Sequence, residues 1–414
     1  TTKPLTTMLM ARLVDEERFE WDTPAVEILP TFEVTAPNLT GALTMRNLVC
    51  ACTGVPRRDF EWLFNASELD AEEVIESVSE FEFFTDFGEA FQYSNQMVAT
   101  GGYLATLAAG GEMETLQSDY VALLQNEILD PMAMNASTFD FEAVAASDNY
   151  AHPYGQTPLA EMVELPLSTE ALLLPLTPAG AMWSNVLDMA NFARTNLDAG
   201  VAPSGDRVVS ADNLAVTWEP QIEISADASY GLGWIIEQYK GLRIISHAGN
   251  TFGFTSELAL VPEADLGISI LTNQQGSALN QIVRIRLLEL LYEQESEVDE
   301  LITFSLERAE DAKQELAAAL VPIEADAIAA YLGDYDNDEL GALSLIWEAD
   351  TLVMDAGEFQ AEVRARETED GETVYFVYEP PFAGIGLDLS EDDAGQRVIN
   401  FGAGLVEYTF EKIE

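Results

Sequence analysis

Apolar residues near the start of the chain recur at the spacing of an α-helix. Leu5, Met8, Leu9 and Leu13 fall on one helical face, and Pro4 is tolerated there because it lies in the first turn. The same spacing predicts further helices over 47–52, 97–107, 187–197 and 279–293.

Alternating and continuous apolar runs later in the chain predict β-strands. Gly and Pro separate these runs, as hairpin turns would. Before residue 300 the strands are expected over 231–236, 243–246, 257–261 and 266–272. Beyond residue 326 short strands follow one another closely, which is typical of a small antiparallel barrel or sandwich. They are expected over 343–347, 351–354, 359–363, 373–378, 384–387, 398–401 and 405–410.

These patterns divide the chain into three parts. We predict a domain of mixed helix and strand over residues 1–300 and an all-β domain over residues 326–414. The charged, alanine-rich segment between them, residues 301–325, is predicted to be a helical connector.

Acidic residues dominate the composition. Seventy-three Asp and Glu against eighteen Lys and Arg give a net charge of −55, and the acids are spread along the chain. A dispersed acidic surface keeps a protein soluble in concentrated salt, where its self-repulsion is screened. We therefore expect a salt-adapted source, with an ordinary acidic secreted protein as the alternative, and favour a periplasmic or secreted location.

Composition also narrows the possible partners and cofactors. The chain has no basic patch that could neutralise phosphates, so nucleic acid is not an expected partner. It has no apolar run of about 18 residues, so no membrane span is expected. Cys50 and Cys52 are too close in sequence for an easy mutual disulfide, and with only two histidines a zinc site is not expected. We expect no metal and no cofactor.

The first candidate for chemistry is Lys3, at the start of the first predicted helix. In enzymes with an S-x-x-K sequence, serine and lysine lie three residues apart on one helical face, so the amine can take the hydroxyl proton. The helix N-terminus also favours developing negative charge. Counting back from Lys3 places such a serine directly before Thr1. A surface lysine near a chain end is the alternative interpretation.

Two later segments add polar groups. Tyr93, Ser94 and Asn95 precede a predicted helix, and a tyrosine and an asparagine one residue apart can both project into a cleft. The phenol could transfer protons if nearby lysine charge lowers its pKa, and the amide could hold a substrate carbonyl. His247, Gly249 and Asn250 lie between two predicted strands. There a glycine permits close approach of substrate backbone, and the Asn250 N–H could supply half of an oxyanion hole.

The order of these segments resembles the serine β-lactamase and penicillin-binding-protein superfamily. The branch it is most similar to contains class C β-lactamases, D-aminopeptidases and esterases, in which histidine often replaces the lysine of the third motif. Flanking segments of residues 1–290 are similar to the family in the same order: 44–56, 128–138, 178–190, 230–234 and 262–273. The C-terminal strands resemble a lipocalin-like barrel attached to some members.

The resemblance implies an α+β fold, with an antiparallel sheet flanked by helices and a helical lobe that carries the tyrosine loop. It also implies a serine hydrolase that forms an acyl-enzyme on a small peptide, amide or ester. Lys3 would be the general base, Tyr93 would transfer protons, and Asn95 would position substrate. His247, Gly249 and Asn250 would form the far wall and the oxyanion hole. The barrel would cover the cleft, mediate assembly into a homo-oligomer, or only stabilise the fold.

The serine itself is not in the sequence, which leaves alternatives open. A separate N-terminal chain could carry it after cleavage before Thr1, an adduct could interrupt the chain, or a segment could be missing. Thr1 could instead act as an N-terminal nucleophile through its own α-amine, although Thr1 and Lys3 would not share a helical face. A non-catalytic penicillin-binding or sensor-like protein is the alternative from a different functional class.

Overall fold

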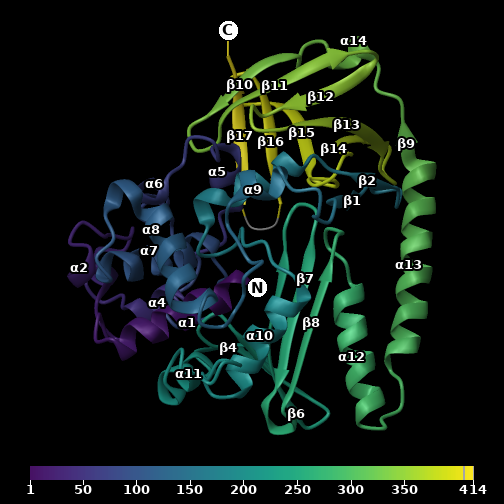
Figure 1. Cartoon of the computed structure of the whole chain (residues 1–414). Helices are drawn as coiled ribbons and strands as arrows, with labels where there is room; N and C mark the ends of the chain where they lie inside the picture. The colour runs from purple at the N-terminus through teal and green to yellow at the C-terminus, as the bar shows by residue number, and fades with distance from the viewer. Residues whose placement is uncertain (404–405, 414) are drawn as a thin grey trace.

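The computed structural model describes residues 1–403 and 406–413. A body of helices and antiparallel strands lies below a closed β-barrel, and a long helix runs along one side (Figure 1). The predicted α+β architecture with a C-terminal barrel is therefore confirmed. No helix among the described residues combines the length and the apolar content needed to cross a bilayer.

Most helices come from the first 220 residues. The α-helices are α1 (Thr2–Asp15), α2 (Ala25–Ile28), α3 (Pro37–Thr40), α4 (Met45–Leu48), α5 (Asp59–Phe64), α6 (Ala71–Ser77), α7 (Asn95–Ala108), α8 (Leu116–Leu124), α9 (Phe141–Ala145), α10 (Val186–Leu197), α11 (Ala211–Thr217), α12 (Leu279–Leu291), α13 (Val298–Ala319) and α14 (Ala325–Ile328). Short irregular helical segments are η1 (Met113–Thr115), η2 (Gln125–Leu129), η3 (Leu167–Leu176) and η4 (Pro262–Ala264).

Helix α1 lies in the centre of the body. The four apolar residues that predicted it, Leu5, Met8, Leu9 and Leu13, are all buried. The polar residues of its first two turns are buried as well, so the helix is enclosed on all sides at this end. Burial of polar side chains is costly unless they are paired, so the start of α1 requires hydrogen-bonding partners.

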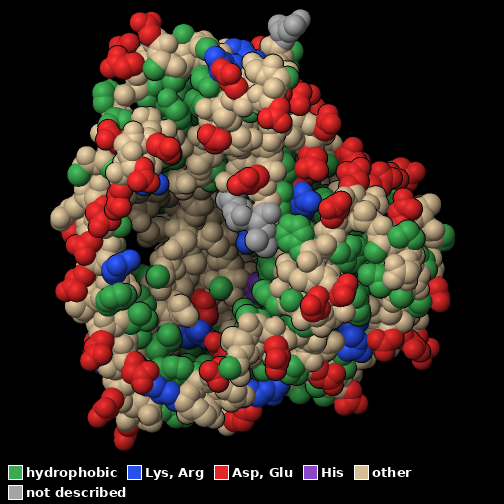
Figure 2. Space-filling model, turned by 180° about the vertical axis from the view of Figure 1, so that it is seen from behind, with side chains coloured by type: hydrophobic (Ala, Val, Ile, Leu, Met, Phe, Trp, Pro, Cys, Tyr) green, Lys and Arg blue, Asp and Glu red, His purple; other side chains and the backbone are tan. Residues whose placement is uncertain are grey.

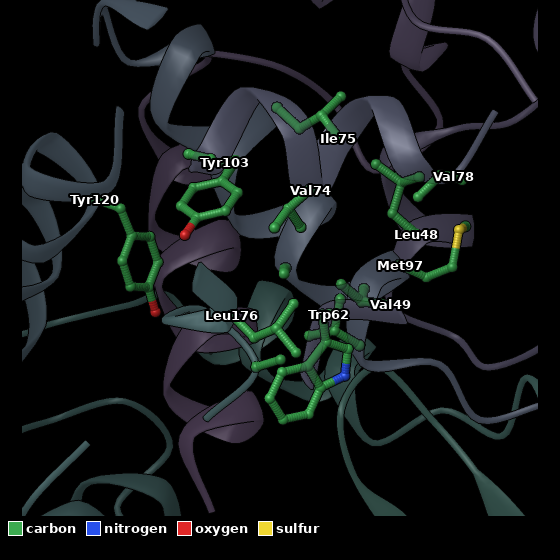
Figure 3. Packing of buried hydrophobic residues seen from close by; sticks show 14 of the residues in the cluster. Leu48, Val49, Trp62, Val74, Ile75, Val78, Met97, Tyr103, Tyr120 and Leu176 are labelled. Atoms are coloured by element: carbon green, nitrogen blue, oxygen red, sulfur yellow. The ribbon is translucent and has the colours of Figure 1, made fainter. Parts of the chain in front are cut away.

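The helical lobe packs beside α1 around one apolar cluster (Figure 3). Helix α7 contacts α4, α6 and α8, and its apolar side chains interdigitate with theirs. Residues of this cluster labelled in Figure 3 are Leu48, Val49, Trp62, Val74, Ile75, Val78, Met97, Tyr103, Tyr120 and Leu176. The packing holds the N-terminus of α7, and therefore the loop before it, in place.

The main sheet is a six-stranded antiparallel meander, and its strands pair in chain order. They are β3 (Ile222–Ser225), β4 (Ala228–Tyr230), β5 (Ile235–Tyr239), β6 (Leu242–Asn250), β7 (Thr255–Val261) and β8 (Leu266–Thr272). Successive side chains of a strand point to opposite faces. Gly267 of β8 approaches Ala193 of α10, whereas Ile268 clusters with Leu288 of α12, so these two helices cover opposite faces. A small hairpin, β1 (Tyr154–Gln156) and β2 (Met162–Glu164), lies beside the turn that joins β6 and β7 at one end of the sheet.

The C-terminal strands close into an eight-stranded barrel. Each pairs antiparallel with the next along the chain, and β10 pairs with β17 to complete the circle. The short β9 (Leu320–Val321) also pairs with β13. The barrel strands are β10 (Gly333–Asn337), β11 (Gly341–Glu348), β12 (Thr351–Asp355), β13 (Gln360–Glu367), β14 (Thr373–Val377), β15 (Gly386–Glu391), β16 (Arg397–Ala403) and β17 (Val406–Lys412). Of these, β10 has no counterpart among the predicted strands, and residue 405 of the last predicted strand lies outside the described residues.

The segment around the cysteines corrects two expectations. The helix predicted over 47–52 ends at Leu48, and Cys50 and Cys52 form a disulfide. Ala51 between them has φ of 52°, and this left-handed turn brings the two Cα atoms to 5.2 Å, within the normal range for a disulfide. Sequence separation alone did not exclude the bond, because the backbone turn decides the distance.

Candidate active site

The start of α1 lies directly against strand β6. A Cβ atom added at Gly249 would be 2.7 Å from the backbone N of Thr1 and 2.5 Å from Ser256 Oγ, closer than real Cβ contacts. Only a glycine at this strand position therefore allows the helix N-terminus to approach. Gly249, which we predicted to face substrate, therefore lies beside Thr1.

Lys3 is a buried residue of the first turn of α1, so the surface-lysine interpretation is wrong. Its side chain has 4% exposure, and Nζ donates to Asn95 Oδ1 and to the Ala179 carbonyl, each at 2.8 Å. Nζ also lies 5.0 Å from the centre of the Tyr93 ring. Burial lowers the pKa of Lys3 to about 7, while the nearby Asp59 carboxylate opposes the shift. A substantial fraction of the amine is therefore neutral near pH 7 and can accept a proton.

Tyr93 and Asn95 project from the loop that leads into α7. Ser94 caps this helix, because its Oγ accepts the Met97 N–H. The cap fixes the backbone between the tyrosine and the asparagine, so both side chains reach the start of α1. Two segments about 90 residues apart in the chain therefore meet, as the motif order predicted.

The protonation state of Tyr93 differs from our expectation. Burial raises the pKa of Tyr93, and the Arg57 charge only partly opposes this. The phenol therefore remains protonated in the resting protein instead of becoming a base. In this state it is a hydrogen-bond donor, and it can give a proton to a group that gains negative charge.

His247 lies on β6 on the opposite side of the site. It is 5% exposed, its Nε2 lies 3.4 Å from the Tyr230 hydroxyl, and its ring centre is 6.4 Å from that of Tyr93. Burial lowers the pKa of His247 well below its usual value, and the positive charge of Lys3 adds to this. The imidazole is neutral, and among the described residues its Nδ1 has no hydrogen-bond partner.

Two other predicted residues are placed differently. Thr1 Oγ1 lies 3.5 Å from Ser256 Oγ, near Gly249 and Lys3. The Asn250 side chain faces the end of β8, where its Oδ1 accepts the Gly276 N–H at 2.6 Å and the Thr255 hydroxyl at 3.1 Å. The Asn250 side chain is therefore engaged in holding the strand ends, and only its backbone is available for substrate.

Sequence reasoning missed Asp59, which touches the site through Asn95. Asp59 Oδ1 accepts the Asn95 Nδ2–H at 2.9 Å and the Trp62 indole N–H at 3.0 Å, and Oδ2 accepts from Arg57 Nε. The residue follows two arginines at the end of a segment that resembles the family. Nothing in its local spacing indicated a partner 36 residues away.

A second missed carboxylate, Glu170, holds the turn after Asn250. This buried residue of η3 accepts the Gly253 N–H at 2.6 Å. Burial raises the pKa of Glu170 to about 7, although bonds from the Thr251 side chain and the Gly253 backbone oppose the shift. The carboxylate thereby connects the segment before α10 to the β6–β7 turn.

A hollow lies in the molecular surface below the barrel (Figure 2). The N-terminus of the chain lies near the middle of the molecule (Figure 1), and Figure 2 shows a hollow under the barrel at that level on the opposite face. Acidic side chains are spread around the rim and over the rest of this face. Among residues 1–403 and 406–413, no group of three His, Cys, Asp or Glu could hold a metal ion.

Comparison with known proteins gives a consistent assignment. The family model described as Beta-lactamase matches residues 1–292. The chain is 27% identical over 303 residues to an unguisins hydrolase of Aspergillus campestris, covering 67% of this chain and 53% of that protein. It is 26% identical over 282 residues to penicillin-binding protein 4 of Amycolatopsis lactamdurans, covering 66% and 70%. The chain thus spans about half the length of the unguisins hydrolases that it matches.

Solved structures show the same fold. The octameric penicillin-binding protein homologue of Pyrococcus abyssi superposes with a TM-score of 0.60 at 18% identity, covering 99% of this chain and 86% of that one. A D-stereospecific amidohydrolase of a Streptomyces species superposes with a TM-score of 0.56 at 19% identity, covering 67% and 82%. The superposition with the Pyrococcus abyssi protein includes the barrel, because it covers 99% of this chain.

Proposed function

Because the chain belongs to the beta-lactamase family, we propose that it hydrolyses a small peptide, amide or ester through a serine acyl-enzyme, with the nucleophilic serine directly before Thr1. The observation that carries this proposal is the environment of Lys3. A buried amine with a pKa of about 7, bonded to Asn95 Oδ1 at 2.8 Å, is suited to accept the hydroxyl proton.

In the proposed mechanism the serine precedes Lys3 by three residues and lies on the same face of α1. Its proton passes to Lys3 Nζ as its Oγ attacks the substrate carbonyl carbon. The oxyanion would be held by the serine N–H and the backbone N–H of Asn250, at the N-terminus of a helix. The protonated Tyr93 then donates to the leaving nitrogen or oxygen and takes back a proton from the Lys3 ammonium. Water attacks the ester that remains, and one of its protons passes to the serine Oγ, which restores the hydroxyl and releases the acid.

His247 has a supporting role in this proposal. It is neutral and its ring lies beside that of Tyr93, so it would form an uncharged wall of the site. Its neutrality also keeps a further positive charge away from Lys3, which helps the amine to remain deprotonated.

The test is active-site labelling of the full-length protein. We would treat it with a fluorophosphonate probe, measure the intact mass, and map the modified residue by peptide analysis. An adduct on a serine directly before Thr1 supports the proposal, and K3M should abolish labelling at that position. An adduct on Thr1 would overturn it in favour of an N-terminal threonine hydrolase. No adduct would overturn it in favour of a binding or sensor-like protein.

We also propose that copies of the chain associate through α12 and α13. These helices run beside the body at its outer edge (Figure 1), and of the 22 residues of α13 only Val298 is buried. They expose large apolar side chains at Leu290, Leu291, Leu301, Phe304 and Leu306. The similar Pyrococcus abyssi protein, which is described as octameric, covers 99% of this chain.

Light scattering after gel filtration tests this association. The wild-type protein should have the mass of an oligomer, and a double variant, L301E/F304E, should reduce it toward that of one chain. E300Q, a neighbouring change on the same helix, is the matched control and should leave the mass unchanged. A monomeric wild type would overturn the proposal.

A further inference from the structure

Helix α5 lies between the barrel and the active-site loop. On one side its aromatic residues pack against the barrel. The Phe60 ring centre is 5.0 Å from that of Phe401, and the Phe64 ring centre is 5.4 Å from the same ring. Tyr408 and Phe410 of β17 complete this cluster. The short helix therefore has a large part of its apolar contact with the barrel.

Polar contacts join the same two parts. The Tyr408 hydroxyl donates to Glu61 Oε1 at 2.6 Å, and Arg58 Nη1 donates to the same oxygen at 2.9 Å. Just beyond α5, the Ser67 N–H donates to Glu358 Oε1 at 2.6 Å. Since a carboxylate between a phenol and a guanidinium is held in one orientation, these bonds set the position of α5 along the barrel.

The first residue of α5 reaches the site. Asp59 accepts the Asn95 Nδ2–H, and Asn95 Oδ1 in turn accepts from Lys3 Nζ. A side-chain amide has its donor and acceptor on opposite sides, so a carboxylate at one end and an ammonium at the other select a single orientation. If the carboxylate were absent, the amide could rotate and present its NH₂ group to Lys3.

We infer that Asp59 is a positioning residue for the Lys3–Asn95 pair, and that α5 makes the docked barrel a functional part of the active site. The contact chain runs from Tyr408 to Glu61, through the single turn of α5 to Asp59, and then to Asn95 and Lys3. The role assigned to Lys3 and Asn95 rests on the proposed function, but the geometric link between the barrel and Lys3 does not.

The first experiment measures Lys3 directly. The chain has only four lysines, so ¹³Cε-lysine labelling of the full-length protein gives few signals, and K3R identifies that of Lys3. The groups that face Lys3 are Asp59, Arg57, Tyr93 and His247. Because the Asp59 charge raises the pKa of Lys3, D59N should move its titration to lower pH. D22N, which removes an exposed acid paired with Arg46, is the control and should not move it.

The second experiment begins in the barrel. Y408F removes the hydroxyl that holds Glu61, and we expect kcat to fall about 3- to 10-fold with little change in KM, because one hydrogen bond is lost. Y335F removes a comparable buried phenol bond, to the Tyr331 carbonyl on another part of the barrel, and should leave kcat unchanged. D59N should lower kcat about 10- to 100-fold, since a bond to a charged group is lost.

The double variant D59N/Y408F tests whether Tyr408 acts through Asp59 or whether the two residues affect turnover independently. If Tyr408 acts through Asp59, the loss in D59N/Y408F will be smaller than the product of the two single losses. Independent losses, or a Lys3 titration that D59N does not move, would overturn the inference. If D59N moves the Lys3 titration but no substrate is hydrolysed and no probe binds, the proposed function fails while the positioning role stands.

Discussion

Lys3 Nζ donates to Asn95 Oδ1 at 2.8 Å, although 92 residues separate them in the chain. The bond joins the first turn of α1 to the first residue of α7, and other segments bury Lys3. It is the contact on which the proposed proton transfer depends, and it makes the titration of Lys3 the first quantity to measure.

Activity should rise with pH through about 7. The pKa of Lys3 is lowered to about 7, so the amine becomes neutral, and able to act as a base, above that pH. We expect kcat/KM to increase through this range and then level off. K3M should reduce turnover by about 10³-fold or more, because the proton acceptor is lost.

K3M should also be more stable than the wild type at pH 7. The pKa of Lys3 is lower in the folded protein than in the unfolded chain, so protonation favours the unfolded chain. The free energy of unfolding therefore decreases as the pH falls from about 10.5 to about 7. Methionine cannot ionise and removes this loss. If kcat/KM of the wild type instead rose near pH 4 to 5, or if K3M were less stable than the wild type, the assignment of Lys3 as the base would be contradicted.

Y93F should lower kcat far more than it changes KM. Burial raises the pKa of Tyr93, so its phenol is protonated at neutral pH and serves as a proton donor. Losing a general acid costs about 10²- to 10⁴-fold in rate. Steady-state kinetics and thermal unfolding should be measured on the same samples. If Y93F instead unfolds at a much lower temperature and binds substrate equally poorly, the tyrosine is structural.

R284M should destabilise the fold strongly. Arg284 of α12 is 5% exposed, forms an ion pair with Glu257 (Nε to Oε1, 3.1 Å), and bonds Glu237 through Nη1. These carboxylates lie on the strands that flank β6. Without the arginine, Glu257 would be buried and unpaired, and the half-buried Glu237 would keep only its bond from the Ser246 hydroxyl. We expect a loss of about 3 kcal/mol or more in the free energy of unfolding.

Two further variants make that measurement specific. R18M removes an arginine that is 49% exposed in an ion pair with Glu16, and should cost less than about 1 kcal/mol. Adding E257Q to R284M should recover part of the loss, because one unpaired charge is removed. Equal effects of R284M and R18M in urea unfolding would show that the buried trio is not important.

E170Q should remove the part of the pH dependence of stability that comes from the Glu170 carboxyl. The pKa of Glu170 is about 7 in the folded protein, above the usual value of 4.5, so the folded state favours the protonated carboxyl. Its contribution is fully present below about pH 4.5 and is lost as pH rises to about 7. At about 1.4 kcal/mol per pKa unit, this loss approaches about 3 kcal/mol at pH 8.

Urea unfolding at pH 4.5 and pH 8 measures the Glu170 effect. E170Q should be more stable than the wild type at pH 8 and similar to it at pH 4.5. E164Q, at an exposed glutamate that binds His152, is the control for a surface carboxylate. A wild type and an E170Q variant with parallel pH profiles would contradict the prediction.

Stability should rise with sodium chloride. The net charge of −55 produces self-repulsion in the folded state. The Debye length falls from about 30 Å at 0.01 M to about 3 Å at 1 M, so this repulsion is largely screened in molar salt. Urea should be the denaturant because it is uncharged. A midpoint that does not move between low and molar salt would contradict the salt-adapted interpretation.

Sequence patterns located the main parts of the site but not their connections. The resemblance to the family indicated Lys3, the Tyr93 loop and the His247 strand, and the period of the apolar residues predicted the elements that carry or adjoin them. Asp59 and Glu170 were not, since a carboxylate that bonds one distant amide leaves no periodic signal. The Cys50–Cys52 bond was missed for a related reason, because it depends on the φ of Ala51.

The sequence by itself determined the helix that carries Lys3, the strand that leads into His247, most of the barrel strands and the charge of −55. These features depend on local spacing and composition. Only the tertiary structure decided that Lys3 is buried, that Tyr93 stays protonated, and that α5 ties the barrel to Asn95. Desolvation and hydrogen-bond pairing arise where segments distant in the chain come together, so they cannot be read from any one segment.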